Sequence, residues 1–110
     1  MNECVMKRVI DTSEVLGSME LSEGNCELCA TAEADYHDDT HQLIVHLDSL
    51  LRTTDLRTPE RHPSAQWLPK PETICESVGL DESMDVARDI FHRWARKVRE
   101  SAPSLHGVAT

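Results

Sequence analysis

The chain has 110 residues, which leaves room for one small domain or two very small modules. Its 39% hydrophobic content includes only two Trp, one Tyr and one Phe, so we expect a thin buried core. The 20 acidic residues outnumber the 11 basic ones and give a net charge of −9, which argues against a surface that binds nucleic acid over its whole extent.

The charged residues also bear on the compartment. Acidic residues dominate and only Lys7, Lys70 and Lys97 are lysines, a balance expected of a salt-adapted cytoplasm; the alternative is ordinary variation in an acidic protein. No apolar run is long enough to span a bilayer, and residues 1–11 lack the apolar core of a signal peptide. We therefore expect a cytoplasmic protein whose four cysteines are reduced thiols or metal ligands.

The N-terminal residues fit two interpretations. Residues 4–10 suit either a short strand or the first turns of a helix. Asp11 followed three positions later by Glu14 has the spacing of a capping box, which predicts a short helix over residues 13–21. The Ser-Glu-Gly-Asn run at 22–25 would end that helix.

The next stretch holds most of the candidate site chemistry. Cys26 and Cys29 form a C-x-x-C pair, a spacing with which two thiolates bind one tetrahedral zinc ion. His37, His41 and His46 follow, and we take Cys26, Cys29, His41 and His46 as the candidate zinc ligands. The alternative is a set of buried or unused thiols, because no second C-x-x-C pair accompanies the first.

The same residues carry a resemblance to a nuclease module. A C-x-x-C pair, an acidic stretch and an apolar run that ends at His46 are similar to the front half of the HNH nuclease module. The resemblance implies that His46 helps to hold a catalytic metal and that the next residue acts as general base. That position holds Leu47, which cannot accept a proton, so catalysis by this route is not expected.

Two secondary structures compete for residues 32–51. A strand over 42–47 favours the nuclease resemblance, whereas one helix over 32–51 would align four leucines on a single face. The absence of Gly and Pro favours the helix. The four leucines are Leu43, Leu47, Leu50 and Leu51.

Residues 52–71 form the clearest boundary in the chain. This segment contains four of the five prolines, which deny it both helical and sheet hydrogen bonds. It is predicted to be a linker, with Trp67 and Leu68 as anchors to a core. Pro71 then suits the first turn of a short helix that would stop at Gly79.

The most regular pattern in the chain follows Gly79 and predicts one amphipathic helix. Acidic residues lie in its first turns and basic residues near its end, so the charges complement the helix dipole. The apolar stripe comprises Met84, Val86, Ala87, Ile90, Phe91, Trp94 and Val98.

Four basic residues stand close together in the second half of this helix. As a group they are candidates for contacts with DNA phosphates. The alternative is a helix end furnished with positive charge for its dipole and for solubility. The four are Arg93, Arg96, Lys97 and Arg99.

The last third of the chain carries a second resemblance. Its landmarks are Ser77-Val78-Gly79-Leu80, then Ala87 with Ile90-Phe91, then Trp94-Ala95, and finally the heptapeptide 104–110. This series resembles the opening of a cyclin-type repeat and is most similar to the repeats of archaeal transcription initiation factor B, a relative of eukaryotic initiation factor IIB. Such a repeat has five helices, so the resemblance implies that a helical partner completes the core.

The sequence thus predicts a small, mainly α protein with a truncated cyclin-like helical segment and a small zinc knuckle, divided into residues 1–51, 52–71 and 72–110. The resemblance to initiation factor B implies non-catalytic docking to promoter DNA or to the TATA-binding protein, as a regulator or as a truncated gene product. The alternatives are a degenerate HNH-type metal-binding nuclease relative and a zinc-structured protein-interaction module.

Overall fold

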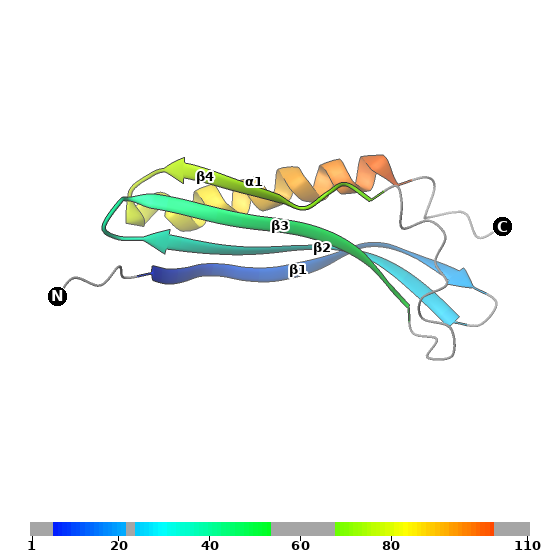
Figure 1. Cartoon of the computed structure of the whole chain (residues 1–110). Coiled ribbons are helices and arrows are strands. Elements are labelled where there is room, and N and C mark those ends of the chain that lie inside the picture. The colour runs from blue at the N-terminus through cyan, green and yellow to red at the C-terminus, as the bar shows by residue number, and fades with distance from the viewer. Residues whose placement is uncertain (1–5, 22–23, 54–67, 103–110) are drawn as a thin grey trace.

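The chain folds as a four-stranded antiparallel sheet with one helix packed on one face (Figure 1). The computed structural model describes residues 6–21, 24–53 and 68–102. The strands lie side by side in chain order and are β1 (Met6–Leu21), β2 (Gly24–His37), β3 (Gln42–Thr53) and β4 (Glu72–Ser77); the helix is α1 (Leu80–Ser101).

The predicted mainly α fold, with its truncated cyclin-like segment and zinc knuckle, is therefore wrong. The expected helix over 13–21 lies in β1, the expected helix over 32–51 is the β2–β3 hairpin, and the expected short helix before Gly79 is β4. The alternative strand over 42–47 is confirmed as part of β3. Of the expected helices, only the amphipathic helix after Gly79 forms as predicted.

Strands form here because every second side chain of β2 and β3 enters the core. In β2 the buried series is Leu28, Ala30, Ala32, Ala34 and Tyr36, and in β3 it is Leu43, Val45, Leu47 and Ser49. A period of two places these side chains on one face of the sheet. Small alanines at the centre of β2 leave room for large side chains from the helix.

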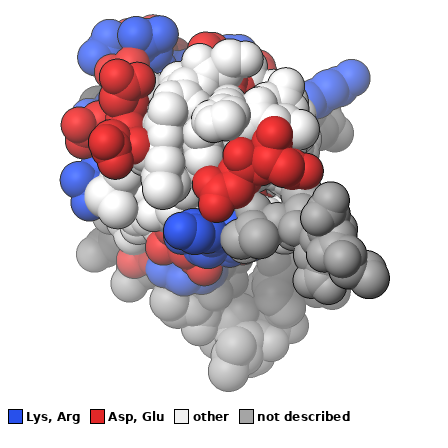
Figure 2. Space-filling model, turned by 90° about the vertical axis from the view of Figure 1, so that its left-hand side faces the viewer, with Lys and Arg blue, Asp and Glu red and all other residues white. Residues whose placement is uncertain are grey.

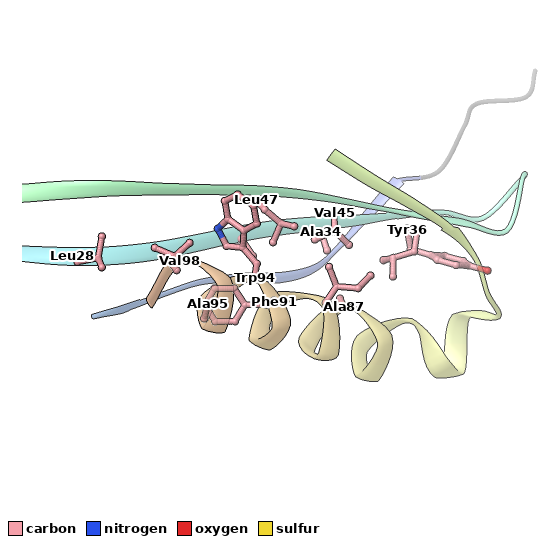
Figure 3. Packing of buried hydrophobic residues seen from close by; sticks show 14 residues of the cluster. Leu28, Ala34, Tyr36, Val45, Leu47, Ala87, Phe91, Trp94, Ala95 and Val98 are labelled. Atoms are coloured by element: carbon pink, nitrogen blue, oxygen red, sulfur yellow. The ribbon is translucent and has the colours of Figure 1, made fainter. Parts of the chain in front are cut away.

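The helix supplies those large side chains. Phe91 and Trp94 are both 3% exposed, and Figure 3 shows Trp94 pointing from α1 toward the sheet beside Leu47. The Trp94 indole N–H also donates a hydrogen bond of 3.1 Å to the Asp48 carbonyl of β3. Met84, expected in the apolar stripe, is instead 43% exposed.

The coverage of the sheet by α1 is uneven. The helix packs on β1, β2 and β3 and hardly touches β4. Four strands spaced about 4.8 Å apart span about 14 Å between the outer strand axes, and a helix is about 10 Å wide, so one helix cannot cover them all. The covered face consequently stays open beside β4.

Hydrogen bonds fix the connection from β4 to α1. The Val78 N–H donates to the His41 carbonyl at 3.2 Å, and the Tyr36 hydroxyl donates to the Val78 carbonyl at 2.8 Å. His41, at the end of the β2–β3 turn, has a positive φ of 55°. In the part of the chain that the structure describes, no helix has the length and apolar character needed to cross a membrane.

Candidate functional site

The four candidate zinc ligands are spread over the sheet. Cys26 and Cys29 are three residues apart in β2, so their side chains project to opposite faces. His46 pairs with Glu33, four residues along β2 from Cys29, which separates the two by about 13 Å. His41 lies farther away, in the β2–β3 turn. Among the described residues no group of three or more His, Cys, Asp or Glu side chains is placed to hold a metal ion.

The surroundings of the two thiols oppose ionisation. Both Cys26 and Cys29 are buried, and burial raises the pKa of each thiol above its ordinary value. A raised pKa reduces the thiolate form that binds metals and attacks electrophiles. These two residues thus have the character of core side chains.

The two residues that carry the nuclease resemblance, His46 and Leu47, also lie on opposite faces of the sheet. Leu47 is 2% exposed in the hydrophobic core, whereas His46 lies on the opposite face, where its Nδ1 is 3.1 Å from the Thr73 hydroxyl. Successive strand residues face opposite sides, so His46 and the position of the expected base cannot act on one substrate.

The basic residues of α1 do not form one patch. At about 100° per residue, Arg93 and Lys97 lie on the flank of the helix toward β4, Arg96 lies on its back, and Arg99 lies toward the opposite flank. Arg93 pairs with Asp89 at 2.7 Å, and Lys97 pairs with Glu72 of β4 at 2.9 Å. The positive charge is therefore divided and partly neutralised.

The open face of the sheet, opposite α1, carries an acidic trough of about 660 Å³. Asp11 of β1 lies directly opposite Glu33 of β2, which in turn lies opposite His46 of β3. Arg8 offsets the like charges, with contacts of 3.6 Å to Asp11, 3.7 Å to Glu33 and 2.7 Å to Asp35. The acidic side chains of the trough are thus partly neutralised by the neighbouring Arg8.

An uncharged patch lies at the end of the molecule where α1 begins. Figure 2 shows white surface in the middle of this end with acidic side chains on both sides of it. Leu80 and Met84, one turn apart on α1, are each 43% exposed. Both side chains are therefore partly open to solvent.

A smaller groove of about 190 Å³ lies between β4 and α1, and we call it the β4–α1 groove. It lies where the helix leaves the sheet uncovered. Its floor is apolar and is formed by Leu47 of β3, Ile74 of β4, and Ile90 and Trp94 of α1. These four side chains all belong to the hydrophobic core or pack against it.

Charged side chains form the rim of the β4–α1 groove. Glu72 and Glu76 stand on the β4 side, and Arg93 and Lys97 on the α1 side. Lys97 crosses the groove to Glu72, and its ammonium lies 5.3 Å from the centre of the Trp94 ring. Within the described residues the Glu76 carboxylate makes no hydrogen bond or ion pair.

The β4 half of this groove was not predicted from the sequence. Residues 71–78 were expected to be helical, although Glu72, Ile74 and Glu76 alternate with Thr73 and Cys75 in the period of a strand. A six-residue strand that follows a proline-rich segment offers few positions for that period, and Pro71 suits the start of a helix. The α1 half, including Trp94, was expected as core.

Comparison with known proteins adds no identity: no family model, no curated protein and no solved structure matches this chain.

Proposed function

We propose that the protein is a non-catalytic docking module that binds a segment of a protein partner in the β4–α1 groove. The observation that carries this proposal is the incomplete cover of the sheet: α1 packs on three strands, and an apolar floor is left between charged rims at the fourth. An apolar centre with polar edges is the composition of a protein-binding surface.

The chemistry of the partner follows from charge. The chain carries −9 in total, and the strand that borders the groove presents Glu72 and Glu76. Lys97 pairs with Glu72, whereas Glu76 has no ion pair within the described residues and is open to a partner. A segment with an apolar side chain for the floor and basic side chains for this rim complements the groove.

The apolar part of this interaction can be measured alone. Burying one leucine side chain contributes about 1.5–3 kcal/mol, so a minimal probe such as N-acetyl-leucine amide should bind with a Kd on the order of tens of millimolar. Titration of isotope-labelled protein, followed by NMR chemical shifts, should move the resonances of Ile74, Ile90 and the Trp94 indole.

Two matched substitutions control this titration. Ile74→Thr keeps a β-branched residue in β4 but makes the floor polar, and should abolish most of the shifts. Val15→Thr makes the same kind of change on the open face, where Val15 is 48% exposed, and should leave them unchanged. Shifts that gather in the acidic trough or at the Leu80 patch, or that are absent at saturating probe, would refute the groove as the docking site.

The resemblance to initiation factor B remains a prediction, with promoter DNA and the TATA-binding protein as its implied partners. The apolar stripe of α1, which that resemblance would pack among further helices, is buried on this chain's own sheet. A pull-down with purified TATA-binding protein in high salt tests the prediction, and failure to bind that protein or promoter DNA would count against it.

A further inference from the structure

The two edges of the sheet differ in a way that concerns partner binding. Edge strands expose backbone hydrogen-bonding groups, and proteins protect them with bulges or charges. The β1 edge is interrupted twice, because its register with β2 shifts between Arg8 and Ile10 and again between Val15 and Gly17. The pairing of β4 with β3 is regular throughout, so β4 presents an even row of backbone groups at the outer side of the described sheet.

The direction of those backbone groups can be assigned. Val78 donates its N–H inward, to the His41 carbonyl. Because the hydrogen-bonding direction alternates along an antiparallel strand, Glu76 and Ile74 also bond inward. The N–H and C=O groups of Thr73, Cys75 and Ser77 therefore point outward, away from β3.

We propose that the docked segment is an extended peptide that adds to β4 as a fifth, antiparallel strand, an inference that rests on the docking function proposed above. Its backbone pairs with Thr73, Cys75 and Ser77. Its alternate side chains fall beside Glu72, Ile74 and Glu76, on the side of the β4–α1 groove. The matching partner pattern is basic-x-apolar-x-basic.

A second copy of this chain fits the edge less well. Antiparallel pairing of two β4 strands about Ile74 places Glu72 opposite Glu76 twice, and like charges directly opposite are destabilising. Pairing about Cys75 sets Ile74 against Glu76, which leaves the apolar floor uncovered. Each copy also brings a net charge of −9. A basic segment from a different protein suits the edge better.

The decisive experiment uses one fluorescent heptapeptide, Thr-Lys-Thr-Leu-Thr-Lys-Thr, and two N-methylated forms of it, with binding followed by fluorescence anisotropy. In the antiparallel arrangement the threonine N–H groups face β4, and the lysine and leucine N–H groups face solvent. N-methylation of the threonines should weaken binding at least about tenfold, whereas N-methylation of the lysines and leucine should change it less than about twofold. Equal effects of the two patterns, a reversed order, or no binding at about 1 mM peptide would overturn the strand addition.

Variants of the protein test the same geometry from the other side. Cys75→Pro removes an outward N–H and none that pairs with β3, so the peptide should lose affinity while the fold is kept. Glu76→Lys should weaken binding of the lysine peptide about two- to fivefold and improve binding of a glutamate peptide. Asp85→Lys changes the net charge equally at an exposed site on α1 and should do neither. Unchanged affinity in both test variants would contradict the proposal, and the N-methylated peptides decide the matter if Cys75→Pro does not fold.

The two proposals can fail separately. If N-acetyl-leucine amide shifts the groove resonances but N-methylation of the peptide has no effect, the groove docks side chains and the strand addition is wrong. If the amide does not shift those resonances, the docking function is wrong and the strand addition is refuted with it.

Discussion

Replacement of Trp94 tests whether α1 is held on the sheet as described. The side chain is 3% exposed, and it donates a hydrogen bond of 3.1 Å to the Asp48 carbonyl. Truncation of a buried Trp to Ala costs about 3–5 kcal/mol, and part of that cost here is an unpaired carbonyl. A domain of this size unfolds with about 5–15 kcal/mol, so Trp94→Ala should remove a large part of its stability.

Urea unfolding followed by far-UV circular dichroism measures this loss without using tryptophan fluorescence. Trp94→Phe keeps a ring in the core but loses the hydrogen bond, and should cost about 1–2 kcal/mol. Met84→Ala on the same helix is the control, since Met84 is 43% exposed and should change stability by less than about 1 kcal/mol. A cost for Trp94→Ala no larger than that of the control would refute the packing of α1 on the sheet.

Three further predictions follow from buried groups. Cys26 and Cys29 face opposite sides of β2, so we expect EDTA to leave the Tm unchanged, and a clear fall would show that a metal supports the fold. Burial raises the pKa of Cys26, Cys29 and Tyr36, so the unfolded chain loses these protons at a lower pH than the folded chain does. The free energy of unfolding should therefore be at its full value below about pH 8.5 and should fall as the pH rises above it. Urea midpoints at several pH values measure this fall, which should be less steep in a Cys26→Ala/Cys29→Ala variant. Within the described residues the buried Ser49 hydroxyl has no hydrogen-bond partner. Ser49→Ala should therefore be neutral or stabilise the fold by up to about 1 kcal/mol in the same urea assay. A loss of stability above about 1 kcal/mol would reveal a partner for that hydroxyl.

The helix was predictable because its stripe is long and strongly periodic. Ala87, Ile90, Phe91, Trp94 and Val98 recur over several turns, and all of them are buried as expected. The stripe specifies a buried face but not the partner that covers it. Either a sheet or a set of helices can cover the same apolar stripe. The resemblance to a cyclin-type repeat favoured helices as the covering elements.

The strands were missed because their inward residues are weakly apolar. Ala30, Ala32 and Ala34 alternate with polar residues in β2, yet alanine is the best helix former and a poor marker of a strand. In β3 the leucines at 43, 47, 50 and 51 also satisfy a helical period, which hides the alternation of Leu43, Val45 and Leu47. Here tertiary packing, with large helix side chains placed over small strand residues, overrides local preference.

The candidate zinc ligands lie apart for a related reason. A C-x-x-C pair brings its thiols together only in a turn, and Cys26 and Cys29 lie in an extended strand. Once β2 is a strand, the same spacing separates the two side chains. The β4–α1 groove could not be predicted from the sequence, because it depends on which strands the helix leaves uncovered, and no local pattern encodes that arrangement.

The order of the elements along the chain has a consequence for biosynthesis. Each strand pairs with its immediate predecessor, so the whole sheet can assemble as it leaves the ribosome. The helix that covers the apolar face of the sheet, Leu80–Ser101, is translated after all four strands. Until then the nascent sheet exposes the apolar surface that will pack against Phe91 and Trp94. Protection from aggregation then depends on chaperones or on rapid docking of the helix.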